Sequence, residues 1–358
     1  MPNRYDHIIA AVMATPWAIM PAKADQIASL LTLRASGEYV ADDQVAAVVA
    51  AAQRPPTTAP RGSAIAVLPM LGTISQRMGM LSEISGGTST EKFGATFDAL
   101  VRDPGVGAIV FDVDSPGGNV NGIPELAAKI RGARGTKPIV AVANSLAASA
   151  AYWLATAADE LVVSPSAQVG SIGVLMLHDD RSGALEQAGH DVTIISAGKF
   201  KAEGNPFGPL TAEAADEFQG LVDDVYGAFV SDVATQRGVS IATVEADFGQ
   251  GRVFNANDAV RAGMADRVET MDQTLVRLST AEGREAVVPR AGGFITSIDG
   301  GATWHARSTD DRLADLESRM DIWEELAPRL IPRLSAWENR VDEHDVGAEL
   351  ARLMKETN

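Results

Sequence analysis

From Ala64 onward, short apolar runs alternate with segments in which apolar residues recur at helical spacing. The short runs predict buried strands, at 64–68, 108–113, 139–143, 161–163, 172–177 and 191–196. The segments between them predict helices, which include 93–101, a segment opening at Ile123–Pro124, 147–157, 182–188 and 211–236. This alternation is typical of repeated β–α crossovers, and we therefore expect a layered α/β domain over residues 61–280.

The two flanks have a different character. Residues 1–60 predict an Ala-rich helical N-terminal region that ends in a Pro-rich linker at 54–60. Residues 281–358 predict a Gly-rich linker and an acidic helical tail, in which apolar residues recur in heptad positions from Leu313. Pro328 and Pro332 interrupt that repeat, so two shorter helices are expected. The tail either packs on its own domain or binds a partner.

Charge and cysteine content exclude several classes of protein. The 47 acidic and 30 basic residues give a net charge of −17, which argues against binding to nucleic-acid phosphates. With no cysteine in the chain, a disulfide, a thiol nucleophile and a cysteine-bound metal are excluded. The apolar stretch 7–20 contains Pro16 and is shorter than the roughly 18 residues of a membrane span, so we expect neither a membrane segment nor a secretion signal.

Familiar catalytic signatures are absent from the sequence. It has no H-E-x-x-H metal motif, no Walker loop, no dinucleotide fingerprint and no G-x-S-x-G elbow, so no metal or organic cofactor is expected. A Ser-His-Asp triad would have to use His178 or His190 among the five histidines. We expect both to be surface or strand-end residues.

Three local features could carry chemistry. Gly117 and Gly118, in D-S-P-G-G after the strand at 108–113, could expose N–H groups for an oxyanion, although the same residues make a good turn. Ser149 lies among small residues at the start of a predicted helix, which could equally be an Ala-rich helix packed on the sheet. Lys201, in G-K-F-K-A-E-G-N-P-F, could act as the base of a Ser-Lys pair or simply be solvated.

The order of these motifs, with A-A-S-A-A-Y-W and G-S-I-G-V between the first and the last, resembles the signal peptide peptidase A family of serine-lysine peptidases over residues 64–268. The resemblance implies Ser149 as nucleophile, Lys201 rather than Lys199 as general base, and Ser171 as the hydrogen-bond partner of that lysine. It also implies an oxyanion site at Gly117 and Gly118, with the N–H of Ala150 contributing. The family usually has two glycines after the nucleophile, whereas Ala150 and Ala151 stand here.

The same resemblance implies a Clp/crotonase-like α/β fold of repeated β-β-α units that forms a homo-oligomer. The stretch from Val169 to Phe207 is most similar to the phage capsid-assembly proteases. That branch implies a soluble serine endopeptidase of the host cytoplasm and the procapsid. Its polypeptide substrates and partners would be scaffold, coat or portal proteins and possibly its own chain, with no nucleic acid and no membrane, and the tail beyond about residue 285 would bind coat or scaffold.

Three alternatives stay open. A host-type peptidase that clears signal or leader peptides would share the site, and neighbouring genes would distinguish it. A non-catalytic capsid assembly scaffold could share the fold without using the Ser-Lys pair. A crotonase-type acyl-CoA enzyme would use the same oxyanion logic but would not need Ser149 and Lys201 together.

Overall fold

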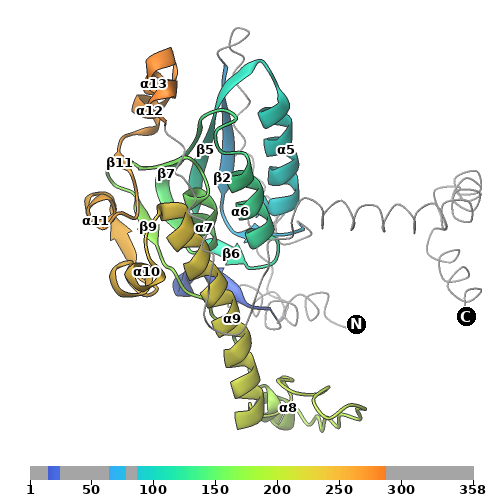
Figure 1. Ribbon diagram of the computed structural model, residues 1–358. Helices are drawn as coiled ribbons and strands as arrows, with labels where there is room; N and C mark the ends of the chain where they lie inside the picture. Colours follow the sequence, from blue (N-terminus) through green and yellow to red (C-terminus); the bar gives the residue numbers. More distant parts are fainter. Residues whose placement is uncertain (1–14, 25–63, 78–86, 288–358) are drawn as a thin grey trace, which may run out of the picture. The chain divides into compact units, whose positions relative to one another are not determined.

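A parallel sheet forms the centre of the computed structural model, which describes residues 15–24, 64–77 and 87–287 (Figure 1). Its main path runs β10-β9-β7-β5-β2, with β8 paired to both β7 and β11. All of these pairs are parallel except β9 with β10. The strands are β2 (Ala64–Leu71), β5 (Val106–Ser115), β7 (Ile139–Ala148), β8 (Glu160–Val163), β9 (Gln168–Gly170), β10 (Val253–Asn255) and β11 (Arg267–Val268).

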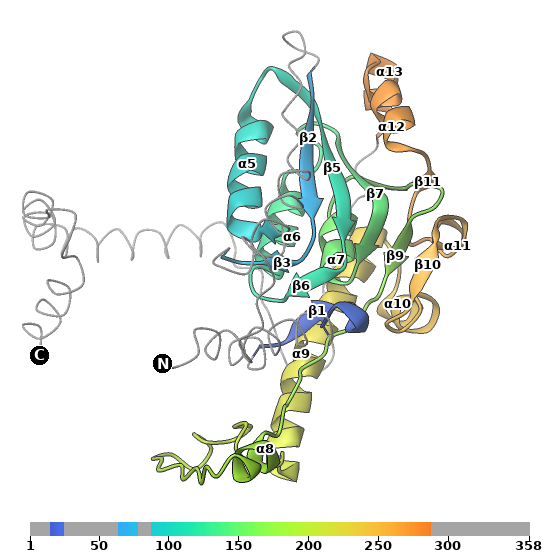
Figure 2. The ribbon, with the colours of Figure 1, turned by 180° about the vertical axis from the view of Figure 1, so that it is seen from behind.

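A smaller sheet, in the order β1-β6-β3-β4, lies at the carboxyl ends of β2 and β5 (Figure 2). Its strands are β1 (Trp17–Ile19), β3 (Ile74–Ser75), β4 (Thr88–Ser89) and β6 (Gly117–Asn119). The chain thus runs β2-β3-β4-α5 and then β5-β6-α6, where α5 is Thr90–Arg102 and α6 is Ile123–Gly132. These are the repeated β-β-α units that the resemblance implies for a Clp/crotonase-like fold.

Helices cover one face of the main sheet and bury the larger core. Alternate residues of β5, including Ile109 and Phe111, enter this core because successive strand side chains point to opposite faces. Phe93 and Phe97 of α5 pack edge-to-face on Phe111, with ring centroids 5.2 and 5.7 Å away. The other helices of this region are α7 (Ala150–Thr156), α9 (Ala212–Arg237), α10 (Ile241–Asp247) and α11 (Ala256–Arg261).

The opposite face carries a second, smaller core. Val110, Val140, Val142 and Val162 pack there with Leu278 of α12 (Met271–Leu278) and with Val287, which follows α13 (Ala281–Glu285). This core therefore continues past residue 280. The second compact unit of the chain, Ile295–Asn358, lies outside the described residues, so the expected tail helices stay predictions.

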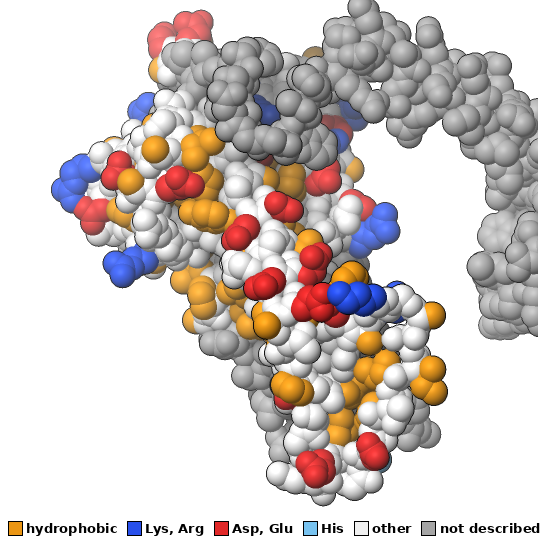
Figure 3. Space-filling model, turned by 60° about the horizontal axis from the view of Figure 1, so that its bottom comes forward, with side chains coloured by type: hydrophobic (Ala, Val, Ile, Leu, Met, Phe, Trp, Pro, Cys, Tyr) orange, Lys and Arg blue, Asp and Glu red, His pale blue; other side chains and the backbone are white. Residues whose placement is uncertain are grey.

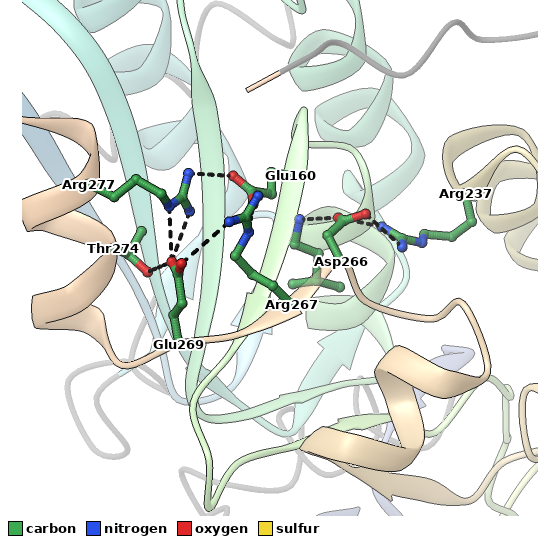
Figure 4. A network of polar contacts seen from close by, with 8 residues as sticks. Glu160, Arg237, Asp266, Arg267, Glu269, Thr274 and Arg277 are labelled. Atoms are coloured by element: carbon green, nitrogen blue, oxygen red, sulfur yellow. Dashed lines mark hydrogen bonds and ion pairs between the residues drawn. The ribbon is translucent and has the colours of Figure 1, made fainter. Parts of the chain in front are cut away.

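Ion pairs join the edge of the sheet to α12 and α9 (Figure 4). Glu160 of β8, 7% exposed at its side chain, pairs with Arg267 and with Arg277. Arg277 also contacts Glu269, at 3.0 Å. Asp266 accepts from both terminal nitrogens of Arg237 and from the amide of Leu161.

The predicted elements are confirmed in most of the domain. β2, β5, β7 and β8 lie where buried runs predict strands, and α8 (Ser182–Gln187) and α9 lie where helices are predicted. No helix of the described segments is long and apolar enough to cross a membrane.

Four predictions of secondary structure are wrong. Residues 172–177 form no strand beyond a bridge at Leu175. Residues 191–196 form no strand because these residues are exposed and have no neighbouring strand to complete a ladder. The helix expected from residue 147 begins at Ala150, since 147–148 still pair with β9. Within the expected N-terminal helical region, Trp17–Ile19 is a strand because it pairs with β6; apart from 15–24, that region lies outside the described residues.

Candidate active site

Three predicted motifs meet because neighbouring parallel strands end at the same edge of the sheet. β5 leads through Ser115 and Pro116 to Gly117, β7 leads to Ser149, and β9 leads to Ser171. β7 lies between β5 and β9 in the sheet, so the serine that follows β7 is flanked by the other two motifs. This is the edge at which open α/β sheets form their sites.

Ser149 occupies a strained turn between β7 and α7. Its φ is 55° and its ψ is −120°, a combination that is sparsely populated by residues other than glycine. Its amide donates to the carbonyl of Gly170 at 2.7 Å, and its own carbonyl accepts from the amide of Trp153 at 3.0 Å, which starts the helix. The hydroxyl is buried and donates to the carbonyl of Gly173 over 3.3 Å.

A bulge in β7 sets up this turn. The register with β5 passes from Val113 opposite Ala143 to Asp114 opposite Leu146, which leaves Asn144 and Ser145 as extra residues. β7 pairs with β8 before the bulge and with β9 after it. Such a bulge redirects a strand, and here it carries the end of β7 toward β9 and the Gly170 carbonyl.

Close packing of the backbone requires glycine at both positions 117 and 118. A Cβ on Gly117 would lie 3.0 Å from both the Ala148 carbonyl oxygen and the Ser149 Cβ, and φ at Gly117 is 98°. A Cβ on Gly118 would overlap the Ile74 carbonyl oxygen. The Gly117 amide donates to the Ser115 hydroxyl at 3.2 Å. Ala150, the first residue of α7, is buried beside them, and its N–H belongs to the first turn, where amides have no partner within the helix.

Ser171 lies next to Gly170, whose carbonyl accepts from the Ser149 amide. It follows Gly170 directly, has a φ of 55° and is 5% exposed, and its amide donates to the carbonyl of Arg252 at 2.7 Å. Ser171 also lines a cavity of about 550 Å³ together with Ile19, Gly173 and Tyr226. The structure therefore brings Ser149, Ser171, Gly117, Gly118 and Ala150 together.

Lys201 is not brought to this group within one chain. It is exposed, in the segment 176–210, none of whose residues is buried. Neighbouring Lys199 pairs with Glu213 in the first turn of α9 at 2.7 Å, whereas Trp153 of α7 donates to Asp232 at 2.8 Å. Glu213 and Asp232 are nineteen residues apart in the same helix, which corresponds to about 28 Å along its axis.

The remaining candidates offer no second site. His178 contacts the Asn205 carbonyl at 3.1 Å and His190 is exposed, both on the 176–210 segment, so neither accompanies Ser149. Among the described residues, no group of three or more His, Asp or Glu side chains could hold a metal ion. Sequence reasoning missed the carbonyls of Gly170, Gly173 and Arg252, which bind the two serines through main-chain groups that carry no side-chain signature.

The β-β-α units and the serine at a strand-to-helix turn define an α/β protein of the Clp/crotonase type. The family model described as peptidase family S49 matches residues 132–284, which include Ser149, Ser171 and Lys201. Over these residues the chain is similar to peptidase family S49.

Two curated relatives are phage proteins. The chain is 32% identical over 294 residues to the head-tail preconnector protein GP5 of Enterobacteria phage P21, a match that covers 78% of this chain and 58% of the relative. It is also 32% identical over 253 residues to the capsid assembly protease C of Escherichia phage lambda, covering 70% of this chain and 57% of the relative. The chain thus spans somewhat over half the length of these relatives. Among solved structures, a ClpP1 mutant from Listeria monocytogenes aligns with a TM-score of 0.34 at 15% identity, covering 61% of this chain and 93% of that one.

Proposed function

We propose that the protein is a serine endopeptidase in which Ser149 is the nucleophile and Lys201 the general base. The observation that carries the proposal is the placement of Ser149 in a strained turn, directly against Gly117 and beside Ser171. Strain at a serine surrounded by glycines and helix-start amides is typical of a nucleophile held for attack. The match of residues 132–284 to the peptidase family S49 model supports the same reaction class.

The reaction proceeds by acyl transfer. The neutral Nζ of Lys201 takes the proton of the Ser149 hydroxyl, and Oγ bonds to the carbonyl carbon of the substrate peptide. Amides at Gly117, Gly118 and Ala150 stabilise the negative oxygen of the tetrahedral intermediate. The C–N bond then breaks as Lys201 returns the proton to the departing amine, and water hydrolyses the acyl-enzyme by the reverse proton route. The Ser171 hydroxyl orients Lys201.

Lys201 reaches Ser149 from a second copy of the chain. Glu213, which pairs with Lys199, lies about 28 Å along α9 from Asp232, which accepts from Trp153. Local side-chain movement cannot close this separation. The segment that carries Lys201 also exposes apolar side chains (Figure 3), namely Val192, Ile194, Ile195, Phe200 and Phe207. Ile195 is 95% exposed. An apolar surface of this kind indicates a protein–protein contact, and a homo-oligomer would cover it while completing the site.

The biological role we propose is capsid maturation, in which the enzyme cleaves scaffold or coat protein inside the procapsid. The names of the relatives from phages P21 and lambda support this role. We propose that the tail beyond about residue 285, which carries the expected heptad pattern, binds coat or scaffold protein. The rival peptidase role is clearance of signal or leader peptides.

The decisive experiment compares the purified protein with its Ser149→Ala and Lys201→Ala variants. Each is incubated with scaffold and coat proteins encoded beside it, and the products are followed by intact mass. Lys199→Ala is the matched control, because Lys199 is two residues from Lys201 and pairs with Glu213. Cleavage by the unmodified protein and by Lys199→Ala alone supports the proposal. Absence of fragments from all four contradicts it and favours a non-catalytic assembly scaffold.

A mixing experiment tests the contribution of the second copy. Ser149→Ala and Lys201→Ala chains are dissociated together and reassembled, so that some sites combine an intact Ser149 with an intact Lys201 from different chains. Activity that reappears in the mixture supports a site shared between copies. An inactive mixture of correctly assembled oligomers contradicts it.

A further inference from the structure

Strand β1 lies between two backbone partners. On one side it runs antiparallel to β6, with Trp17 opposite Asn119 and Ile19 opposite Gly117. On the other side, Trp17 and Leu175 exchange two backbone hydrogen bonds of 2.9 Å. The segment is thus held by its main chain on both sides, as an extended peptide would be.

The C-terminal end of β1 approaches Ser149. The amide of Met20 donates to the carbonyl of Pro116 at 3.0 Å, just before Gly117. A Cβ on Gly117 would overlap the Ala18 carbonyl oxygen and would lie 3.0 Å from the Ser149 Cβ. Gly117 therefore lies against both the main chain of β1 and the proposed nucleophile.

β1 is not part of the β-β-α framework. Residues 25–63 separate it from β2 in the chain, while β6 and Leu175 belong to the domain that follows. Without β1, the edge of β6 that faces it would be unpaired, and an unpaired strand edge is a template for an incoming peptide. The N–H and C=O groups on this edge of β6 cannot pair with β1 and with an incoming peptide at the same time.

The side chains of β1 show what this position accepts. Trp17, Ala18 and Ile19 are 7%, 0% and 3% exposed. Ile19 lines the cavity of about 550 Å³ that also contains Ser171 and Gly173. The position takes a large apolar side chain, then a small one, then a second large apolar one.

The geometry points to β1 as an internal occupant of the substrate site: residues 15–20 fill the groove between β6 and Leu175 in which a polypeptide substrate must pair. This inference rests on the proposed peptidase function and adds the substrate class, an extended segment with a large–small–large apolar pattern. A tethered occupant competes with substrate at an effective concentration on the order of millimolar, so β1 lowers the activity of the resting chain without abolishing it.

A reversible covalent lock tests the inference. The chain has no cysteine, so Trp17→Cys with Leu175→Cys introduces a single pair. Antiparallel residues that exchange hydrogen bonds have Cα atoms about 5.5 Å apart, within the range of a disulfide. The pair is placed in the full chain with Ser149→Ala, and binding of a fluorescent peptide with the sequence of residues 13–22 is followed by anisotropy. Because binding rather than hydrolysis is measured, failure of the proposed catalysis does not affect the result.

We expect the reduced protein to bind the peptide at least tenfold more tightly than the oxidised protein. Equal binding by both forms, or no binding by the reduced form, overturns the inference. Should the cysteine pair prevent folding, Ile19→Ala in the full chain serves instead, with at least tenfold tighter binding expected than in the Ser149→Ala parent. Val276→Ala, which is 69% exposed on α12, is the matched control and should leave the peptide affinity unchanged.

Discussion

Ser149 and Ser171 share a backbone angle, a φ of 55°, and the amide of Ser149 donates to the carbonyl of the residue just before Ser171. In the described part of the chain, Gln250 is the one other non-glycine residue with positive φ. Two neighbouring strands are therefore each followed by a serine with positive φ, and each such residue costs on the order of 1–3 kcal/mol. The rest of the fold sustains that cost at the edge of the sheet where the proposed nucleophile lies.

Replacing Ser149 by glycine should relieve this strain and stabilise the protein, although the same change removes the proposed nucleophile. We expect Ser149→Gly to exceed Ser149→Ala in free energy of unfolding by about 1 kcal/mol, since glycine adopts positive φ without steric cost. Both variants should lose peptidase activity by about four orders of magnitude or more. Urea denaturation compares the stabilities, and a glycine variant less stable than the alanine variant would contradict the assigned strain.

Gly118 should tolerate no side chain. Gly118→Ala would place a methyl group on the Ile74 carbonyl, and we expect a loss of about 3 kcal/mol in the free energy of unfolding. Gly220→Ala is the control, because it lies in α9 with open space around it and should gain up to about 1 kcal/mol from helix propensity. Thermal denaturation of the two variants checks the opposite signs.

The Arg237–Asp266 pair should matter far more than exposed ion pairs. The Arg237 side chain is 2% exposed, so Asp266→Ala leaves a buried charge without its bidentate carboxylate and should cost about 3–5 kcal/mol. Glu91 pairs with Arg77 at the surface, and Glu91→Ala should cost less than about 1 kcal/mol. Denaturant titration of both variants tests the contrast, which fails if the two losses are similar.

Stability should fall as the pH rises through the titration of Asp159. Burial raises the pKa of this carboxyl, although the Ile139 amide that donates to it at 2.9 Å acts in the opposite direction. The folded chain thus holds this proton more tightly than the unfolded chain. The stabilisation is complete below the unfolded pKa and is lost as the pH rises through the folded pKa.

Asp159→Asn should remove that loss, because asparagine keeps an acceptor for the Ile139 amide without ionising. Relative to the unmodified protein, the variant should gain free energy of unfolding between pH 4 and pH 7. Urea denaturation at the two pH values measures this difference. A constant offset between the proteins would argue against a raised pKa.

The central sheet could be predicted because its parallel strands are buried on both faces and read as short apolar runs, as at 108–113 and 139–143. The residues around Ser149 could be named because their motifs follow consecutive strands. The strand at Trp17–Ile19 could not be found, since its ladder partner is about a hundred residues away and its local composition favours a helix. Periodicity also failed at 191–196, where alternating apolar residues face outward rather than into this chain's core.

The position of Lys201 relative to Ser149 is the second feature that could not be predicted from the sequence. Sequence order places it after a predicted strand end, close to the serine in the expected topology. The long helix α9 instead separates the two, because its two ends contact different segments. A single sequence does not show how many chains assemble a site.

The bulge at Asn144 and Ser145 divides β7 between two ladders, one with β8 and one with β9. Amides 146–148 can therefore open with β9 while 140–143 stay protected by the central sheet. Hydrogen exchange at these two groups of amides would separate local rearrangement beside Ser149 from global unfolding. Faster exchange at 146–148 than at 140–143 would identify the part of β7 that pairs with β9 as a hinge for Ser149.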